Sequence, residues 1–523
     1  MNSEAQYTID EPAHPEVIAD SLQALVSARK RPIARHRLLV LDTFNGRIAA
    51  AGGRLTARVG EEGARLEWQP RDRQVRLEVS VKTPVDFAWN LPGGPLRDSL
   101  QPIINVRRLL PQVEVEIQGR VLDVLDDDRK TVARIRIEGG RARTPRRAGT
   151  WHSIPTMLTL TALRGYDAAY ERLLRIIESR PGLERSLADL QVIALQAAGA
   201  PPPRDLSRFD VALVPSVRAD VGAREIHRAL LNIMVANEPG LRADLDTEFL
   251  HDYRVSLRRT RSLLGQIKNV FPEDAVTHFR NEFRWLARAT NPTRDLDVLL
   301  LNLRAISEGA PPDELPTILA FLTQKQRHEH RLLKRLLESD RYRDLVARWR
   351  DFLETAMTGK AEPAESARPL AEVTSRRIWR LYRRLVDQAT AIHDNTPAIA
   401  IHQVRIRAKK LRYLIDATRS LHDRRHLDPI VGSLKSVQSV LGDFNDAYVQ
   451  ERHLMESGRA LAEAGAGDSG ALLTIGRLAE NARIRAASLR GELSDELSRF
   501  CKDDIRECFG RLFKRTTAVG AAP

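Results

Sequence analysis

A block of this sequence occurs twice, with a separation of 151 residues from His251 to His402. Residues 251–261 read HDYRVSLRRTR and residues 402–412 read HQVRIRAKKLR, so cations recur at matching positions. The segments TRDLDV (293–298) and FNDAYV (444–449) keep the same separation without a gap. A shared spacing of this length indicates an internal duplication. The chain is therefore constrained to build one structural unit twice.

Each repeated block carries its cations as a stripe on a predicted helix. Successive residues of an α-helix advance by about 100°, so offsets of 0, 3, 7 and 10 residues fall within an arc of roughly 80°. In the first block these offsets are His251, Arg254, Arg258 and Arg261. One such stripe is ordinarily a solvated face. Its repetition at the same place in both copies favours a functional surface, and we expect the two stripes to converge on one anion track.

The charge balance points to an anionic partner. Lys and Arg number 83 against 69 Asp and Glu, which gives a formal charge of +14 and a pI near 10.0. Because 42% of the residues are hydrophobic, the chain can form ordinary cores and is not a disordered polycation. Nucleic acid, a lipid surface or a polyanion would all suit this charge.

The expected compartment is a reducing one. We find no apolar run that could cross a bilayer and no N-terminal leader, so we expect a soluble cytoplasmic protein. The two cysteines, Cys501 and Cys508, lie about 10 Å apart along a predicted helix, which is too far for a disulfide. They suggest no metal site.

The first domain is predicted to be a β domain spanning residues 1–205. Hydrophobic residues alternate with period two from about residue 36 to 140, with turns expected at AGG, DDD and GG. Charged residues occupy many alternate positions, and pairing across neighbouring strands is a slightly better explanation for them than ligand binding. Helical patterns follow at 166–178 and 183–198, and GAPPPRD (199–205) is predicted to be the linker.

The second domain, 215–515, is predicted to be entirely helical. Its two copies would span about 216–360 and 365–515. Breaks at NEPG (237–240), GAPPDE (309–314), residues 361–367 and GAGDSG (465–470) divide it into helices suited to antiparallel bundles. The fold class is therefore α+β with two domains.

The motifs of the helical domain resemble the CHAD family, the conserved histidine α-helical domain. They are H-x-x-R-V-x-x-R-R-x-R-S with W-L-A-R-A and R-D-L-D-V, and then H-x-x-R-I-x-x-K-K-L-R-Y with L-G-D-F-N-D. The resemblance implies two pseudo-symmetric four-helix bundles whose basic surfaces and central pore bind inorganic polyphosphate, in some members on polyphosphate granules. The implied binding residues, with further cations at the repeat spacing, are His251, Arg254, Arg258, Arg259, Arg261, Lys268, Arg284, His402, Arg405, Lys409, Lys410, Arg412, Arg419 and Lys435.

The β region is similar to a CYTH domain, an eight-stranded triphosphate tunnel that often precedes CHAD. LLVLDTFNGRIAAAGGRLTARV (38–59) resembles two of that family's strands. The E-x-E-x-K motif of the family is represented at best by YTIDE (7–11), and the late glutamate-bearing strand reads MLTLTALRG (157–165). Hydroxyls are poor substitutes for carboxylates as ligands of hard cations. We therefore expect a degenerate tunnel without catalytic residues, cofactor or metal.

Polyphosphate is the favoured ligand on chemical grounds as well. A linear polyphosphate offers a run of charges and no bases, and the planar fork of Arg suits phosphate. Aromatic residues are 5% of the chain, so a base-stacking platform has little support. Binding of a nucleic-acid backbone without sequence preference is the second hypothesis, and residual triphosphate hydrolysis is the third.

Other polar residues of the repeats have simpler explanations than catalysis. Asp295, Asp297 and Asp446 could be metal ligands, but capping a helix or orienting Arg is the better explanation. His251 and His402 lack an accompanying nucleophile or paired carboxylate. We expect them to donate to phosphate or to make structural hydrogen bonds.

Overall fold

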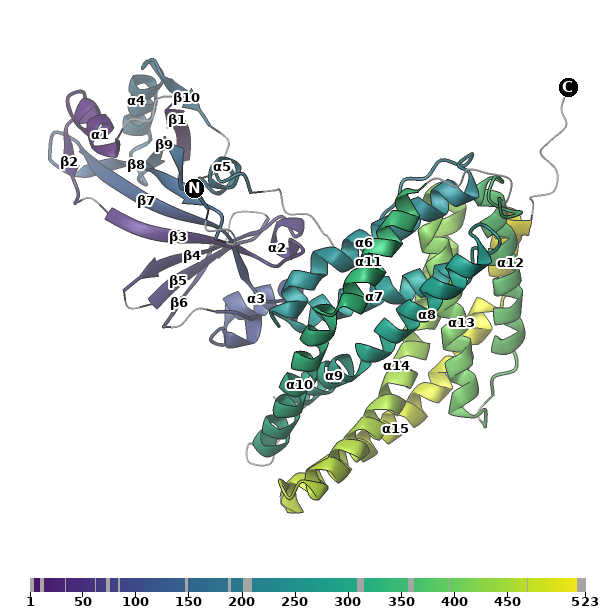
Figure 1. Ribbon diagram of the computed structural model, residues 1–523. Helices are drawn as coiled ribbons and strands as arrows, with labels where there is room; N and C mark the ends of the chain where they lie inside the picture. Colours follow the sequence, from purple (N-terminus) through teal and green to yellow (C-terminus); the bar gives the residue numbers. More distant parts are fainter. Residues whose placement is uncertain are drawn as a thin grey trace, which may run out of the picture. The chain divides into compact units, whose positions relative to one another are not determined.

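The computed structural model divides into two compact units, Met1–Leu206 and Ser207–Pro523 (Figure 1). Each unit is described by itself. The described residues are 4–514, apart from 10–13, 33, 62, 72–75, 83–84, 146–148, 187–189, 201–208, 308–314, 356–361, 394 and 468.

The first unit is built on one antiparallel sheet of ten strands, in the order β10-β1-β9-β8-β7-β3-β4-β5-β6 with β2 paired to β7. This confirms the antiparallel β fold predicted from the period-two pattern. The strands are β1 (Glu4–Ile9), β2 (Ala28–Lys30), β3 (Ala34–Asp42), β4 (Arg54–Gly60), β5 (Gly63–Gln69), β6 (Leu77–Val81), β7 (Leu110–Leu125), β8 (Thr131–Arg143), β9 (His152–Ala162) and β10 (Leu183–Arg185).

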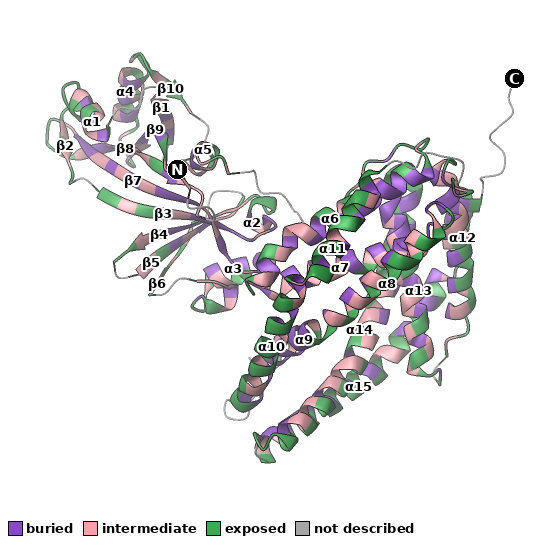
Figure 2. Ribbon diagram, viewed as in Figure 1, coloured by how far each residue is buried: buried purple, intermediate pink, exposed green. Residues whose placement is uncertain are grey.

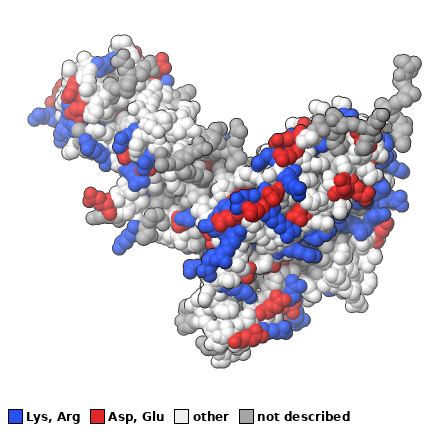
Figure 3. Space-filling model, in the orientation of Figure 1, with Lys and Arg blue, Asp and Glu red and all other residues white. Residues whose placement is uncertain are grey.

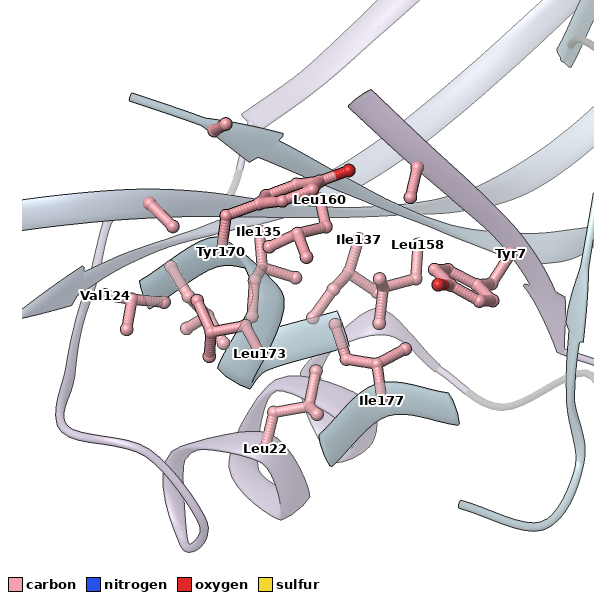
Figure 4. Close-up of a cluster of buried hydrophobic side chains, with 14 of the residues drawn as sticks. Tyr7, Leu22, Val124, Ile135, Ile137, Leu158, Leu160, Tyr170, Leu173 and Ile177 are labelled. Carbon is pink, nitrogen blue, oxygen red and sulfur yellow. The ribbon is translucent and has the colours of Figure 1, made fainter. Parts of the chain in front are cut away.

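Helices cover both faces of this sheet. On one face α1 (Pro15–Gln23) and α4 (Asp167–Glu178) pack against the strands, where Leu22 and Leu173 meet Leu158 in a buried cluster (Figure 4). On the other face α5 (Leu190–Ala197) places Ile193 in a second cluster with residues of β3, β7 and β9. The short helices α2 (Arg47–Ala50) and α3 (Pro95–Ile104) complete the unit. Side chains of successive strand residues point to opposite faces, which explains the two separate clusters.

Charges on neighbouring strands pair with each other, as the alternation suggested. Arg143 lies 2.9 Å from Glu114, and Arg141 lies 2.6 Å from Glu116, in each case between β8 and β7. Much of the predicted Arg and Glu alternation is therefore internal to the sheet.

Two local predictions for this unit were wrong. The expected turn at Gly139 and Gly140 lies inside β8, where a Cβ on Gly140 would be 1.9 Å from the carbonyl oxygen of Glu116. Glycine is thus needed there for close approach of two strands. The helix expected from residue 183 begins at Leu190, because Leu183–Arg185 pairs with the edge strand β1.

The second unit is helical, and its helices repeat with the spacing of the sequence blocks. The starts of α6, α7 and α8 at Ala219, Thr247 and Glu273 correspond to those of α12, α13 and α14 at Leu370, Ala398 and Arg424. The helices are α6 (Ala219–Arg242), α7 (Thr247–Leu264), α8 (Glu273–Ala289), α9 (Asn291–Ser307), α10 (Leu315–Leu337), α11 (Asp340–Glu354), α12 (Leu370–Ala389), α13 (Ala398–Ala417), α14 (Arg424–Glu463), α15 (Ser469–Phe500) and α16 (Asp503–Phe509).

Reciprocal backbone hydrogen bonds relate the two copies by an approximate two-fold axis. The N–H of Ala219 donates to the carbonyl of Arg368 (2.8 Å), and the N–H of Leu370 donates to the carbonyl of Val217 (2.9 Å). Adding 151 to the donor of the first bond and subtracting 151 from its acceptor gives the second bond. Equivalent residues therefore face each other across this axis, as in an isologous interface.

The predicted break at NEPG was wrong, because α6 continues through Pro239 to Arg242. The side-chain amide of Asn237 donates to the carbonyl of Ile233 (2.8 Å) within this helix. The helix ends three residues beyond Pro239. The expected break at 309–314 lies outside the described residues.

Each long helix carries a buried stripe, which Figure 2 shows as purple segments along the ribbons. In the first copy, Trp349 of α11 is 1% exposed and contacts Phe279, Phe283 and Phe352. Aromatic packing of this kind fixes the helices that carry the cations. Among the described helices, none has the length and apolarity needed to cross a membrane.

Candidate anion-binding site

The two cationic stripes meet at one cavity of about 620 Å³ within the helical unit. Its wall is drawn from α7, α9, α13, α14 and α15. Equivalent residues of the two copies line it together: Arg254 with Arg405, Arg258 with Lys409, and Asp295 with Asp446. The cavity therefore lies at the pseudo-two-fold axis. For these residues, the structure shows the two stripes converging on one cavity, as expected.

Three cations of this wall remain available, namely Arg258, Lys409 and Arg485. In the described part of the chain, none of their side chains forms an ion pair or hydrogen bond with another residue. The pKa of Lys409 is lowered to about 8, first by burial and then by the neighbouring charges of Arg405 and Arg258. A cation that is partly desolvated and surrounded by like charge gains strongly from a bound anion.

Arg254 and Arg405 are held in place at the same wall. The guanidinium of Arg254 donates to the hydroxyl of Thr290 (2.5 Å) and to the side-chain oxygen of Asn291 (2.6 Å). Arg405 lies 3.4 Å from Asp446, and its Nε is buried without a partner. Burial lowers the pKa of Arg254 to about 10. These contacts fix the direction of both guanidinium groups.

The two histidines make structural hydrogen bonds in different ways. Nδ1 of His251 lies 2.9 Å from Nη2 of Arg294. Because a guanidinium can only donate, this Nδ1 accepts and the ring proton is on Nε2. Nδ1 of His402 lies 2.7 Å from Oδ1 of Asn445, so there Nδ1 carries the proton and donates. His251 lines the cavity, whereas His402 lies outside its wall.

The carboxylates of the site orient cations or are buried. In the described residues, no group of three or more His, Cys, Asp or Glu is placed to hold a metal ion. Asp446 pairs with Arg405, as expected for a carboxylate that orients Arg. Asp297 is 3% exposed and accepts from Gln326 (3.1 Å), and burial raises its pKa to about 7.

Several predicted cations lie away from the cavity and have partners of their own. Arg259 stacks over the ring of Tyr413 and lies 3.7 Å from Asp416, which also accepts from Arg412 (2.7 Å). These residues join α7 to α13. Arg419 pairs with Asp428 at 2.6 Å.

The remaining predicted residues are outside the cavity wall. Lys268, Arg284, Lys410 and Lys435 are exposed, and Arg261 is half-buried. The structure thus divides the predicted set. Five members line the cavity, namely His251, Arg254, Arg258, Arg405 and Lys409.

The sequence analysis did not identify Arg294, Asn445 and Arg485, which also line the cavity. Arg294 and Asn445 are equivalent residues of the two copies and lie within the TRDLDV and FNDAYV segments. Their repeated position beside an aspartate could have identified them from the sequence. No such pattern marks Arg485, because α15 comes to the cavity wall only through tertiary packing.

The interior of the first unit holds a small cavity of about 150 Å³, which is lined by residues of seven strands. Its lining combines arginines, among them Arg58 and Arg136, with the carboxylates Glu4, Glu67 and Glu138. Burial raises the pKa of Glu138, which weakens it as a ligand for a divalent cation. Part of the same face is filled by the apolar cluster around Ile193 of α5. The YTIDE motif lies partly outside the described residues.

The helical unit matches a known protein family. Residues 225–455 match the family model described as the CHAD domain. Two curated relatives, uncharacterised proteins from two strains of Mycobacterium tuberculosis, are each 29% identical over 258 residues, which is 46% of this chain and 47% of theirs. The chain thus spans about half the length of the curated relatives it matches.

Three solved structures are similar to parts of the chain. The CHAD domain from the plant Ricinus communis is 24% identical with a TM-score of 0.47, covering 56% of this chain and 96% of that chain. PptA from Streptomyces chartreusis is 18% identical with a TM-score of 0.41, covering 54% and 100%. HpAC1 from Hippeastrum, a protein with a dominant triphosphatase activity, is 12% identical with a TM-score of 0.28, covering 39% and 98%.

Proposed function

We propose that this protein binds inorganic polyphosphate in the cavity of its helical unit, of which residues 225–455 match the CHAD domain. CHAD domains are associated with polyphosphate binding in general. The proposal adds a site in this chain, namely the cavity wall that carries Arg258 and Lys409.

One observation carries the proposal. Cations from both copies line a single cavity, and Arg258 and Lys409 lack an ion pair with any described residue. Their repulsion is a cost to the free protein, and a multivalent anion would remove it. Arg254 and Arg405 add guanidinium donors whose direction is already fixed. Preorganised donors of this type suit phosphate oxygens.

Polyphosphate fits this wall better than single-stranded nucleic acid does. The residues that line the cavity include Arg, Lys, Asp, Asn and aliphatic side chains and no Phe, Trp or Tyr. Bases bind single-strand proteins largely by stacking on aromatic rings. A polymer of phosphates needs only donors along its path.

The first unit supports no hydrolytic role in this proposal. Carboxylates placed to hold divalent cations beside a triphosphate are what that chemistry requires. The interior cavity mixes arginines with Glu4, Glu67 and Glu138, and the pKa of Glu138 is raised by burial. Among the described residues, these carboxylates do not form a group placed to hold a metal ion. We infer a non-enzymatic protein, located in the cytoplasm and associated with polyphosphate granules.

The proposal is tested by titrating sodium polyphosphate into the 523-residue chain and its Arg258→Gln/Lys409→Gln variant, with isothermal calorimetry as the readout. The variant should bind at least about tenfold more weakly, since two charge-assisted contacts are lost. The matched control is Lys268→Gln/Lys435→Gln, which removes two exposed charges away from the cavity and should keep its affinity. Equal weakening in both variants would contradict a site in the cavity.

The natural polymer can be identified after purification. Protein isolated at low salt should carry a polymer that an exopolyphosphatase releases and a nuclease does not. Release by nuclease alone would replace polyphosphate with a nucleic-acid backbone as the ligand.

A further inference from the structure

Another hollow of the helical unit lies where α12 meets α16 and the π-helical turn Gly510–Lys514, and its volume is about 860 Å³. Its wall carries an indole ring and charged side chains of both signs. These are Trp379 of α12 with Asp503, Arg506, Glu507, Arg511 and Lys514. None of them lines the candidate anion cavity between the two copies. The hollow is therefore a separate candidate site, which we call the Trp379 pocket.

Trp379 gives this pocket an aromatic surface on a firmly packed base. The indole is half-buried, and its ring centroid lies 5.7 Å from that of Tyr382. Tyr382 is 2% exposed, stacks on Phe509 at 3.8 Å and meets the ring of Phe500 edge-on. A partly exposed ring held by such packing is preorganised to stack against a planar ligand. By contrast, the candidate anion cavity carries no Phe, Trp or Tyr.

The pocket contains cations that have no acidic partner. Arg511 lies 3.5 Å from Glu507. Arg506 and Lys514 are exposed, and neither side chain makes an ion pair or a hydrogen bond within the described part of the chain. Charge alone would not distinguish this place, because Lys, Arg, Asp and Glu are spread over the visible face of the helical unit in Figure 3. The combination of unpaired cations with an indole ring does distinguish it.

A buried hydroxyl group beside the pocket also lacks a partner. The side-chain oxygen of Tyr382 is buried and makes no hydrogen bond to any described residue. Burial raises the pKa of Tyr382 to about 12, and the charges that act on the same hydroxyl include those of Arg506 and Asp503. Both of these residues line the pocket, so the hydroxyl lies near it. A buried O–H group without an acceptor is costly, and an acceptor on a bound ligand would remove that cost.

The duplication does not produce this pocket twice. At the repeat spacing, Trp379 corresponds to Arg228 and Asp503 corresponds to Phe352. In the first copy the guanidinium of Arg228 donates to the carbonyl of Leu353 (3.1 Å), and Phe352 packs in an aromatic cluster. The first copy thus closes with internal contacts the place that the second copy leaves open. The pocket is not a by-product of the repeated fold.

We propose that the Trp379 pocket binds a nucleotide, with its base stacked on Trp379 and its phosphates contacted by Arg506 and Lys514. Stacking on an indole tolerates any base, because every base has a π-face. Arg and Lys form charge-assisted hydrogen bonds with phosphate oxygens. Asp503 makes no hydrogen bond or ion pair with a described residue, and a carboxylate of this kind accepts from sugar hydroxyls. The inference does not rest on the proposed function.

A nucleotide fits the pocket better than polyphosphate does. A phosphate polymer has no ring to place on Trp379, and it would meet the carboxylates of Asp503 and Glu507. A nucleotide uses the ring, the unpaired cations and the free carboxylate together. The two sites of the helical unit therefore differ in the chemistry that they recognise.

The test uses the 523-residue chain and two pairs of matched variants, with isothermal calorimetry as the readout. Trp379→Leu removes the stacking ring, and its control Trp285→Leu makes the same change at a half-buried tryptophan of α8. Arg506→Gln/Lys514→Gln removes the two unpaired cations. Its control, Arg327→Gln/Lys334→Gln, removes equal charge from exposed positions of α10. The ligands are ATP, adenosine and tripolyphosphate.

Trp379→Leu should bind ATP about tenfold more weakly, because the stacking contact of the base is lost. Its affinity for tripolyphosphate should not change, since that ligand has no ring. Arg506→Gln/Lys514→Gln should also bind ATP about tenfold more weakly, and adenosine should bind the unmodified protein more weakly than ATP does. The controls should change the ATP affinity by less than about twofold. Circular dichroism would verify that every variant folds.

An unchanged ATP affinity in both pocket variants would overturn the inference, as would an equal loss in Trp379→Leu and Trp285→Leu. If Trp379→Leu loses tripolyphosphate as strongly as ATP, the ring does not act by stacking and the proposal fails. Single-stranded poly(A) that binds more tightly than ATP and is lost in Trp379→Leu would assign the pocket to nucleic acid instead. Long-chain polyphosphate should bind Trp379→Leu normally, so failure of the proposed function and failure of this inference are separate results.

Discussion

Lys409 should make polyphosphate binding depend on pH in the alkaline range. Its pKa is lowered to about 8, first by burial and then by the adjacent Arg405 and Arg258. In the free protein about nine-tenths of this side chain is therefore charged at pH 7 and about one-tenth at pH 9. The bound anion stabilises the charged amine, so binding at pH 9 requires uptake of a proton.

The expected magnitude follows from these fractions. If the polymer binds the protonated form, affinity should fall about tenfold between pH 7 and pH 9, which is about 1.4 kcal/mol. Terminal phosphates ionise near pH 6, so the charge of the polymer is nearly constant over this range. Isothermal calorimetry at constant ionic strength between pH 7 and 9 would measure the slope.

The variant Lys409→Arg separates this effect from a general loss of charge. Arginine stays protonated throughout the range, so its affinity should be almost independent of pH. As a control, Lys435→Arg makes the same change at an exposed position outside the cavity and should keep the original slope. If the unmodified protein and Lys409→Arg show the same pH dependence, Lys409 does not contact the bound anion.

Three further predictions concern the site and the fold. His251→Phe should weaken polyphosphate binding several-fold, because Arg294 loses the ring nitrogen that accepts its hydrogen bond; an unchanged affinity in a folded variant would show that other contacts orient Arg294. The 523-residue chain should release no phosphate from triphosphate with magnesium or manganese, and turnover that disappears in Glu138→Gln would reveal a working carboxylate. Trp349→Ala should lower the free energy of unfolding of the helical unit by about 3–5 kcal/mol in denaturant titrations, because the side chain is 1% exposed among aromatic rings; a loss under about 1 kcal/mol would show that the site collapses around the smaller residue.

The family resemblance and the fold class could both be taken from the sequence because they depend on local spacing. The recurrence of H-x-x-R with a fixed separation identified the repeated unit. Helix starts at Thr247 and Ala398 show the same separation in the structure. The alternation of the β region likewise predicted the antiparallel sheet, since side chains of a strand alternate between its two faces.

Local rules were less successful where distant segments act on the backbone. Pro239 and Gly240 are typical of a helix break, yet α6 continues past them, and Gly240 packs against the ring of Phe249 of α7. Gly139 and Gly140 are typical of a turn, yet they lie in β8, where the neighbouring strand leaves no room for a Cβ on Gly140. In each case a contact across the fold outweighs the propensity of the segment.

The sequence by itself determined that this protein has a duplicated helical unit with a cationic stripe on one helix of each copy. Spacing along a helix fixes which residues share a face, and no other part of the chain is needed for that inference. The sequence could not decide which of these cations remain without an ion pair. Arg258 and Lys409 face the cavity without an ion pair in the described residues, whereas Arg259 and Arg412 meet Asp416. A cation is neutralised only if the packing of the helices brings a carboxylate within about 4 Å of it. Only the tertiary structure therefore distinguishes the binding cations from the structural ones.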